Sequence, residues 1–366
     1  KNLTKFTNMP NQNSTHDHPV IIAKGMAVKS ASSAFEPYNF TRRNPRENDV
    51  VIEIKYCGIC HSDIHQARSE WFPSIYPMVP GHEIAGIVKQ IGSKVSKYKI
   101  GDRVGVGCFV DSCRTCDNCH NHLDNYCLNG NVLTYNSLEK DGKTPTQGGY
   151  SDVIVVDENY VLKIPDNISL EHAAPLLCAG ITLYSPLKNW LVGKNKKVGI
   201  IGMGGLGHMG LKIAVAMQSE VTVFSHSDRK KEDAIKMGAK NFVIANSENF
   251  AQLQSQFDLI INTVSSAEIN LSEYFNLLKF DATLVAIGAP DKPYSINPFP
   301  LIMMRRKFAG SVIGSIDETQ EMLDFCGKNN ITPEIEIINP NYIDQAYQRM
   351  LRSDVRYRFV IDMKKL

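Results

Sequence analysis

The chain has 366 residues, which at about 150 residues per domain suggests two domains and allows a substantial core. This length excludes a small disulfide-stabilised scaffold, and 43% apolar and 21% charged residues with 25 Gly and 17 Pro exclude disorder and collagen-like repeats. Because 40 Lys and Arg balance 38 Asp and Glu to a net charge of +2, the chain has no general electrostatic attraction to nucleic acid or an anionic membrane.

The N-terminal residues and the apolar runs argue against export and membrane insertion. Residues 1–19 are polar and lack the apolar centre of a signal peptide, so we expect a disordered leader there. The longest apolar run, 173–187, is shorter than the ~18 residues of a membrane span and is interrupted by Pro175 and Pro186. Nine cysteines, four of them crowded into one loop, favour reduced thiols and a cytoplasmic location over a disulfide framework.

The pattern of elements changes about halfway along the chain. In the first half, short β-rich runs alternate with Gly and Pro, at 50–54, 83–88 and 150–156. After Leu191, apolar strands alternate with helices, and strands are expected at 197–201, 221–225, 241–244, 259–264 and 283–288. A helix at 317–328 and strands at 334–338 and 358–363 follow. The sequence therefore predicts an α/β protein with a β-rich domain and a parallel-sheet domain.

A glycine-rich turn follows the first strand of the parallel series. Gly202, Gly204, Gly205 and Gly207, with Leu206 between the last two, match G-x-G-x-x-G. The pattern alone is weak, but here it follows an apolar strand and opens an amphipathic helix. The backbone can then approach a pyrophosphate at the positive end of the helix. The alternative is a glycine loop between packed elements.

The end of the next strand carries Ser225, His226 and Ser227, where an NAD-binding protein would place an acidic residue on the ribose hydroxyls. Arg229 and Lys230 follow, then a further lysine. Hydroxyl donors beside cations suit the 2′-phosphate of NADP, and the absence of a carboxylate removes the usual partner of NAD. The alternative is that the cations form only the solvated face of a helix.

A polar loop contains Cys113, Cys116, Cys119 and Cys127, spaced C-x2-C-x2-C-x7-C. Four thiolates at this spacing can surround Zn²⁺ as a tetrahedron with no open position, which indicates a structural site. An iron–sulfur cluster and chance clustering are the alternatives, but the tight spacing resembles a structural zinc loop more than the usual cluster motifs.

Three further segments stand in unusual contexts: Cys57-Gly58-Ile59-Cys60-His61-Ser62-Asp63-Ile64-His65, Pro80-Gly81-His82-Glu83 and Leu177-Cys178-Ala179-Gly180. Together with the glycine-rich turn, and in this order, they resemble the zinc-dependent medium-chain alcohol dehydrogenases. The similarity is greatest to the cinnamyl alcohol dehydrogenase subgroup and its bacterial NADP-dependent aldehyde reductases. It extends from about Ala23 to Met363 and includes the motifs 76–83, 147–150 and 354–359.

The resemblance implies that Cys60, His82 and Cys178 bind a catalytic zinc, with Glu83 able to take the fourth position when substrate is absent. Two thiolates and an imidazole leave Zn²⁺ a position for a substrate oxygen, where it polarises an aldehyde or lowers the pKa of an alcohol. Asp63 corresponds to the carboxylate that orients the ligand histidine.

The resemblance also implies a proton relay through Ser62 and His65, since a hydroxyl can pass a proton to an imidazole that titrates near neutral pH. His61 occupies the position from which some members of the family contact the cofactor pyrophosphate, although an ordinary polar residue is the alternative. With the cysteine loop, the expected cofactors are two zinc ions per chain and NADP.

The family further implies a GroES-like catalytic domain of residues 20–178 and 316–366, a Rossmann NADP-binding domain of 179–315, and a homodimer joined through the edges of the cofactor domains. Leu133 replaces the Trp that plant cinnamyl enzymes carry before Thr-Tyr-Asn. Trp71 and Phe72 are expected to line the substrate pocket or else to be core aromatics.

The expected activity is NADP-dependent hydride transfer on a small alcohol or aldehyde of aromatic or medium-chain type. Two alternatives remain open at this point. A polyol dehydrogenase is disfavoured by the third cysteine ligand, Cys178, which related polyol enzymes commonly lack. A catalytically silent, NADP-binding redox sensor is disfavoured by the intact set of zinc and relay residues.

Overall fold

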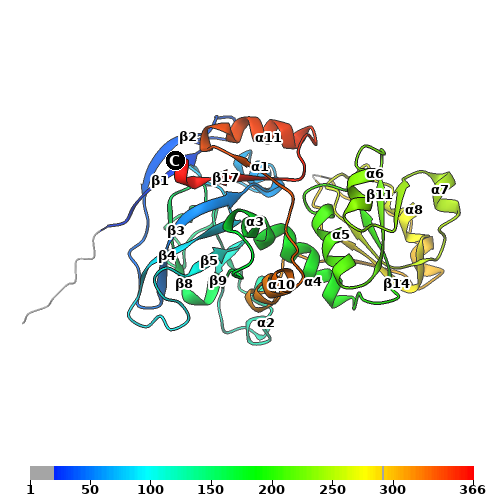
Figure 1. The fold of residues 1–366 in the computed structure, drawn as a ribbon, viewed down its shortest axis with the longest axis horizontal. Helices are drawn as coiled ribbons and strands as arrows, with labels where there is room; N and C mark the ends of the chain where they lie inside the picture. Colours follow the sequence, from blue (N-terminus) through cyan, green and yellow to red (C-terminus); the bar gives the residue numbers. More distant parts are fainter. Residues whose placement is uncertain (1–19, 291) are drawn as a thin grey trace, which may run out of the picture.

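The computed structural model describes residues 20–290 and 292–366, so the leader expected at 1–19 lies outside the described residues. The ribbon separates into two lobes, each built on its own sheet (Figure 1). The N-terminal and C-terminal parts of the chain form one lobe together, and the middle of the chain forms the other (Figure 1). Each functional motif can therefore be assigned to one lobe.

The β-rich lobe is built on a seven-stranded sheet in the order β16-β17-β3-β4-β5-β9, with β8 also paired to β3. Its strands are β3 (Asp49–Gly58), β4 (Ile84–Ile91), β5 (Arg103–Val106), β8 (Val153–Asp157), β9 (Leu162–Lys163), β16 (Ile335–Ile338) and β17 (Arg358–Asp362). Two smaller sheets pair β1 (Ile22–Ala27) with β2 (Glu36–Thr41) and β6 (Phe109–Asp111) with β7 (Val132–Leu133). Because β17 pairs antiparallel with β3, the C-terminal strand lies beside one of the first strands of the chain.

Short helices surround this sheet and carry several of the motifs. They are α1 (His61–Ala67), α2 (Asp117–His120), α3 (Leu170–Pro175), α4 (Ile181–Asn189), α10 (Ile316–Lys328) and α11 (Ile343–Leu351). The 3₁₀ turns are η1 (Asp124–Tyr126), η2 (Glu158–Tyr160), η4 (Pro340–Tyr342) and η5 (Met363–Lys365), and η3 (Leu176–Gly180) is a π-helical turn. Single π-helical turns often occur at functional sites, and this one contains Cys178.

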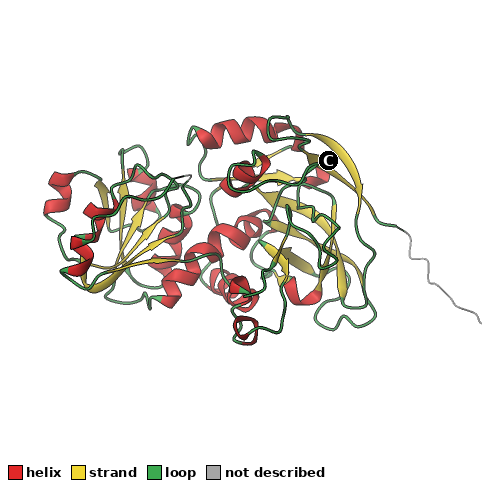
Figure 2. Cartoon of the chain, turned by 180° about the vertical axis from the view of Figure 1, so that it is seen from behind, coloured by secondary structure: helices red, strands yellow, loops and turns green. Residues whose placement is uncertain are grey.

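The second lobe contains a six-stranded parallel sheet in the order β12-β11-β10-β13-β14-β15. Its strands are β10 (Lys197–Ile201), β11 (Glu220–Ser225), β12 (Asn241–Ile244), β13 (Phe257–Asn262), β14 (Leu278–Ala286) and β15 (Lys307–Gly310). Its helices are α5 (Gly207–Ala216), α6 (Lys231–Lys236), α7 (Ser247–Ala251), α8 (Leu271–Phe275) and α9 (Phe299–Ile302). Numbered within the lobe, this is the 3-2-1-4-5-6 order of a doubly wound dinucleotide-binding sheet, whose strands fan out in Figure 2.

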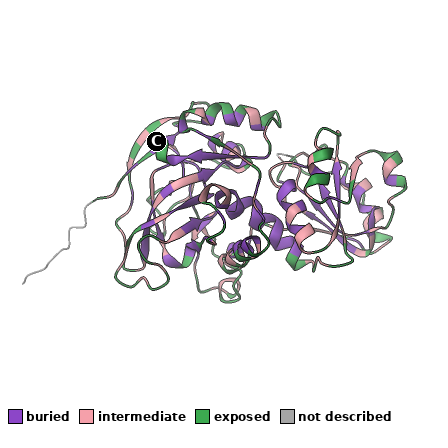
Figure 3. Cartoon of the chain, viewed as in Figure 1, coloured by how far each residue is buried: buried purple, intermediate pink, exposed green. Residues whose placement is uncertain are grey.

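The two lobes share a hydrophobic core at their junction. One cluster of buried side chains joins Leu162 of β9, Leu183 of α4, Ile200 of β10 and Met322 of α10. Figure 3 shows α4 and the central strands of both sheets as mostly buried, whereas α10 is only partly buried. The junction is therefore a packed interface and not only a linker.

The structure shifts some boundaries expected from sequence. Tyr150 was expected to begin a strand, but β8 starts only at Val153. The reason is that the Tyr150 N–H donates to Pro80 O at 2.9 Å, and Met26 N–H donates to Tyr150 O at 2.8 Å. Tyr150 is therefore bonded to the segment that carries His82 instead of continuing the β8 ladder.

Within residues 20–290 and 292–366, no helix is long and apolar enough to cross a membrane.

Candidate active site

Four buried residues of the β-rich lobe bring their ligand atoms together. The Sγ atoms of Cys60 and Cys178, a ring nitrogen of His82 and a carboxylate oxygen of Glu83 all lie within 4.8 Å of one another. Cys60 caps the N-terminus of α1, His82 and Glu83 directly precede β4, and Cys178 comes from the π-helical turn. The residues expected to bind the catalytic metal are thus assembled from three distant parts of the sequence.

The donor set fits Zn²⁺. Two thiolates and an imidazole are ligands that zinc prefers, and their number leaves one position open. The two sulfur atoms lie 3.8 Å apart, and the hydrogen bond from Cys178 lowers the pKa of Cys60 well below its ordinary value. Glu83 Oε2 is buried and has no hydrogen-bond partner among the described residues. A divalent cation at this point would neutralise both thiolates and offer the carboxylate a partner.

Asp63 lies directly behind the histidine ligand. Its Oδ1 is 3.2 Å from His82 Nδ1, and the side chain is fully buried. Its Oδ2 accepts hydrogen bonds from the Cys60 backbone N–H at 2.8 Å and from the Tyr150 hydroxyl at 3.1 Å. This arrangement suits a carboxylate that fixes the ring direction of a metal-binding histidine.

Three buried tyrosines surround Asp63, and sequence reasoning did not assign them a role. Tyr135 stacks on His82 with ring centroids 5.8 Å apart, and the Tyr150 and Tyr347 hydroxyl oxygens are 3.2 Å apart. Burial raises the pKa of all three phenols, so they remain neutral. The motif 147–150 contains Tyr150 and the Thr-Tyr-Asn segment after Leu133 contains Tyr135, but no spacing connects any of the three tyrosines with Asp63.

Arg358, which lies within the C-terminal motif but was assigned no role, connects the metal cluster with the glycine-rich turn. Its Nη2 pairs with Glu83 Oε1, and both side chains are almost completely buried. Burial raises the pKa of Glu83 to about 7 against the opposing effect of Arg358. A Cβ added to Gly205 would lie 2.8 Å from Arg358 Cδ, and a Cβ on Gly58 would collide with Glu83 Oε2. These two glycines therefore allow the arginine and the carboxylate to occupy the site.

The expected relay residues lie on α1, next to the metal cluster. Ser62 Oγ is 3.6 Å from Cys60 Sγ. One turn further on, His65 Nδ1 lies 2.6 Å from Glu70 Oε2, and its ring stacks on Trp71 with centroids 4.6 Å apart. With Nδ1 engaged by the carboxylate, Nε2 is the nitrogen available for proton exchange. His61, the first residue of the helix, is exposed.

The glycine-rich turn connects β10 to α5 at the point where the order of the parallel sheet reverses. Gly202 has φ +90°, a conformation that favours glycine, and a Cβ on Gly207 would collide with Gly202 O. A Cβ on Gly204 would meet nothing within 4 Å among the described residues. This open space beside the first turn of a ten-residue helix fits the approach of a dinucleotide pyrophosphate.

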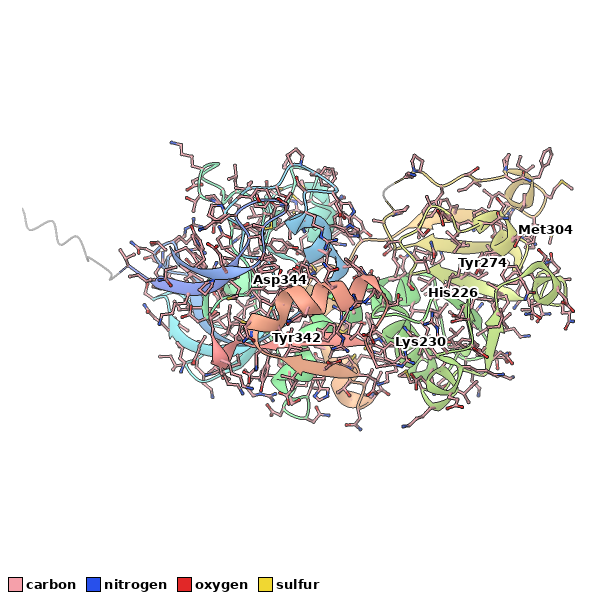
Figure 4. The ribbon with its side chains drawn as sticks, turned by 90° about the horizontal axis from the view of Figure 1, so that it is seen from above. His226, Lys230, Tyr274, Met304, Tyr342 and Asp344 are labelled. Atoms are coloured by element: carbon pink, nitrogen blue, oxygen red, sulfur yellow. The ribbon has the colours of Figure 1, made fainter. Side chains whose placement is uncertain are left out.

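The residues expected at the 2′-phosphate lie at the end of β11. Ser225 ends the strand and accepts a hydrogen bond at 3.4 Å from the Ser227 N–H, while His226 and Arg229 are exposed. Lys230 extends back to the glycine-rich turn and donates to Met203 O at 2.9 Å. Figure 4 shows His226 and Lys230 nearer to the β-rich lobe than Tyr274 and Met304 are.

The cysteine loop brings its four sulfur atoms within 4.8 Å of one another. Backbone N–H groups point at the sulfurs: those of Thr115 and Cys116 donate to Cys113 Sγ at 3.5 and 3.3 Å, and that of Leu128 donates to Cys116 Sγ at 3.4 Å. The hydrogen bond from the Thr115 N–H is the largest cause of the lowered pKa of Cys113, about 5, and the bond from the Cys116 N–H acts in the same direction. The tetrathiolate set fits a closed zinc site.

The aromatic residues expected at the substrate pocket differ in exposure. Phe72 is 77% exposed, which rules out its alternative role as a core aromatic, whereas Trp71 is half-buried against His65. Leu133, on β7, is 37% exposed.

Comparison with known proteins agrees with this geometry. Residues 46–166 match the family model described as alcohol dehydrogenase GroES-like domain, and residues 205–328 match that of zinc-binding dehydrogenase. The chain is 57% identical to the NADP-dependent alcohol dehydrogenase C of Mycobacterium bovis, over 93% of this chain and 99% of that protein. It is 52% identical to the aldehyde reductase YahK of Escherichia coli, over 94% and 99%.

A solved structure is similar over the same extent. The cinnamyl alcohol dehydrogenase of Helicobacter pylori, determined with NADP(H), superimposes with a TM-score of 0.89 at 47% identity, over 95% of this chain and 99% of that one. The chain therefore belongs to the zinc-dependent medium-chain alcohol dehydrogenases, within their cinnamyl alcohol dehydrogenase subgroup.

Proposed function

We propose that the protein transfers hydride between NADP(H) and a small alcohol or aldehyde at a zinc site formed by Cys60, His82 and Cys178. The observation that carries the proposal is the buried cluster of three zinc-type ligands with Glu83, connected by Arg358 to the glycine-rich turn. Bound Zn²⁺ supplies a Lewis acid that polarises a carbonyl or acidifies an alcohol, and NADP(H) supplies or accepts the hydride.

In the proposed site, Asp63 keeps the His82 ring in its binding orientation through the short Nδ1–Oδ1 separation. Ser62 is close enough to the cluster to exchange a proton with a substrate hydroxyl, and His65 passes that proton towards solvent. Glu83 is the fourth possible ligand. The pairing with Arg358 favours its charged form and so supports that role.

The proposed cofactor site uses the second lobe. The turn of Gly202, Gly204, Gly205, Leu206 and Gly207 lets the pyrophosphate approach the N-terminus of α5, with His61 and Arg358 as donors from the other lobe. We place the 2′-phosphate at the end of β11. Its proposed donors are the residues at and just after the end of this strand: Ser225, His226, Ser227, Arg229 and Lys230. The names of the relatives, which specify NADP, support this assignment.

The second zinc is placed in the tetrathiolate of Cys113, Cys116, Cys119 and Cys127, where it orders a loop and does no chemistry. We assign residues 20–178 and 316–366 to the catalytic domain and 179–315 to the cofactor domain, in agreement with the separate sheets. Because both sites need reduced thiols, we also place the enzyme in the cytoplasm.

We propose a homodimer joined through the edge strand β15. This strand is last in the six-stranded sheet, so its outer backbone groups are available to pair with a second copy. The neighbouring α9 region exposes Phe299, Ile302 and Met303, at 66%, 68% and 73%. An apolar cluster beside an unpaired sheet edge fits association of two identical chains.

The direct test is a panel of aldehydes and alcohols assayed with NADPH and NADH, together with metal analysis of the purified protein. We expect two zinc ions per chain and turnover with NADPH. One matched variant is Cys178→Ser, which should lose one zinc and the activity while remaining folded. The other is Cys108→Ser: the Cys108 thiol donates to Leu177 O at 3.9 Å but belongs to neither ligand cluster, so this variant should keep both zinc ions. One zinc or none in the unmodified protein, or iron in its place, would contradict the proposal.

A further inference from the structure

Asp233 stands close to the proposed 2′-phosphate site, and two side chains from the other lobe engage it. It lies in α6, three residues after Lys230. Its Oδ2 accepts a hydrogen bond from the Tyr357 hydroxyl and lies 3.0 Å from Arg356 Nε. Both partners directly precede β17, so they belong to the lobe that carries the metal cluster.

Tyr357 also contacts Lys230 directly and is connected through His208 with the turn that would bind the cofactor. It is 3% exposed, and its ring stacks on His208 with centroids 4.9 Å apart. Lys230 Nζ lies over the Tyr357 ring, 5.0 Å from its centroid, and donates a hydrogen bond to Met203 O. His208 Nδ1 lies 3.2 Å from Gly204 O. Tyr357 thus contacts Lys230 and Asp233 directly, and it is connected to the glycine-rich turn through His208 and Lys230.

Without its contacts to Tyr357 and Arg356, the Asp233 carboxylate would oppose the binding of NADP. The 2′-phosphate carries nearly two negative charges, and a like charge nearby disfavours it. Asp233 would also be free to pair with Lys230, since side chains three residues apart at the start of a helix are neighbours. The ion pair with Arg356 offsets the charge of Asp233, and the hydrogen bond from Tyr357 holds the carboxylate in place, so that together they oppose both effects.

We propose that Tyr357, assisted by Arg356, contributes to the selectivity for NADP(H) over NAD(H) by keeping the Asp233 carboxylate away from the 2′-phosphate. The inference rests on the proposed NADP dependence. Tyr357 is a positioning residue, because it acts through Asp233 and Lys230. The selectivity of the cofactor domain then depends on the catalytic lobe, which supplies both residues that engage Asp233.

The test uses Tyr357→Phe, which removes the hydroxyl and keeps the ring on His208 and Lys230. We expect KM for NADPH to rise roughly tenfold, with kcat and the KM for NADH nearly unchanged, because one hydrogen bond to a charged group is lost. A readout independent of turnover is calorimetric binding of adenosine 2′,5′-bisphosphate, which should weaken by a similar factor, and of 5′-AMP, which should not change.

Two comparisons separate this role from general damage. In the Asp233→Asn background, Tyr357→Phe should have no further effect, since the carboxylate on which it acts is gone. The matched control is Tyr184→Phe, because the Tyr184 hydroxyl also donates to a carboxylate, Glu321 Oε1 at 2.8 Å, but between α4 and α10. That variant should leave the affinities for both nucleotides unchanged.

The possible results distinguish a failure of the NADP dependence from a failure of the role of Tyr357. If the unmodified enzyme binds adenosine 2′,5′-bisphosphate no more tightly than 5′-AMP, the NADP dependence fails and the role of Tyr357 fails with it. If the unmodified enzyme discriminates and Tyr357→Phe discriminates equally well, only the role of Tyr357 is overturned. An equal loss in the Asp233→Asn background would also overturn it, because Asp233 would then not be the residue through which Tyr357 acts.

Discussion

His65 is the residue at which the proposed relay would meet solvent. It is half-buried, and its Nδ1 is engaged by the exposed carboxylate of Glu70. The stacking on Trp71 fixes the plane of the ring, so the imidazole is already oriented. An imidazole held in this orientation suits proton exchange between a buried site and water.

We therefore expect His65→Ala to slow alcohol oxidation near neutral pH by roughly 10²-fold or less, because solvent can partly replace the imidazole. Both zinc ions should remain bound. The measurement is the pH–rate profile in both directions, and added imidazole should restore part of the rate. A variant with the unmodified pH–rate profile would remove His65 from the relay.

Ser225 is the second residue at which a single change is informative. A charge-assisted contact contributes about 1.5–3 kcal/mol, so NADPH should exceed NADH at least roughly tenfold in kcat/KM. Ser225→Asp places a carboxylate at the end of β11 and should raise KM for NADPH far more than KM for NADH. The control is Ser225→Asn, because asparagine is equal in size to aspartate but neutral. It should raise KM for NADPH much less. Equal kcat/KM for both cofactors in the unmodified enzyme would mean that Arg229 and Lys230 form only a solvated helix face.

At the scale of elements, the cysteine loop supports more than its own fold. Asn125 Nδ2 donates to Val312 O at 3.0 Å, the Tyr126 hydroxyl accepts from Val312 N–H at 3.3 Å, and Asp124 Oδ2 accepts from Ile316 N–H at 3.4 Å. These bonds connect the loop with the segment through which the chain returns from the second lobe to the first. A metal that orders the loop therefore also stabilises the junction.

Cys116→Ser should accordingly destabilise the whole protein. We expect a loss of about 2 kcal/mol in stability. At about 2–4 °C per kcal/mol for a domain of 150–250 residues, this corresponds to a fall in Tm of about 4–8 °C. One zinc per chain should be lost at the same time. Cys108→Ser, outside the tetrathiolate, provides the comparison and should retain both metal ions. If Cys116→Ser left Tm and zinc content unchanged, the structural role of this site would be refuted.

The elements differ in how far the sequence could predict them. The alternation of apolar strands and helices after Leu191 predicted the parallel sheet, and its fold class is confirmed by the family matches. Helix α11 was not predicted, although its buried residues Ile343, Ala346, Tyr347 and Met350 have helical spacing that a periodicity search would detect.

The contacts around the site were less accessible to sequence reasoning. The short motifs indicated Cys60, His82 and Cys178, because family motifs preserve local spacing. The approach of Tyr347 to Tyr150 joins residues 197 positions apart, and the pairing of Arg358 with Glu83 joins residues 275 positions apart. Such contacts arise only when β17 pairs with β3 and α11 packs beside them, which no local pattern specifies.

At the scale of the whole molecule, the β-rich lobe and the cofactor lobe depend on each other. They share the buried cluster of α4, β10 and α10, and the residues preceding β17 contact both the glycine-rich turn and α6. A change in the relative position of the lobes would therefore alter the metal-side partner Arg358 and the cofactor-side partner Tyr357 together. The lobes form one functional unit, although their sheets are separate.

The proposed dimer interface can be tested with a single charge substitution. Met303→Glu places a charge in the exposed apolar cluster of the α9 region, beside the edge strand β15. Burying that charge in an interface should cost at least about 2 kcal/mol, which corresponds to a roughly 30-fold weaker Kd for the dimer. Light scattering after size-exclusion chromatography should show a dimer for the unmodified protein and a shift towards monomer for the variant. Ile100→Glu, at an equally apolar position 65% exposed on the other lobe, should remain dimeric. A monomeric unmodified protein, or a Met303→Glu variant as dimeric as the control, would show that the edge of this sheet is not the interface.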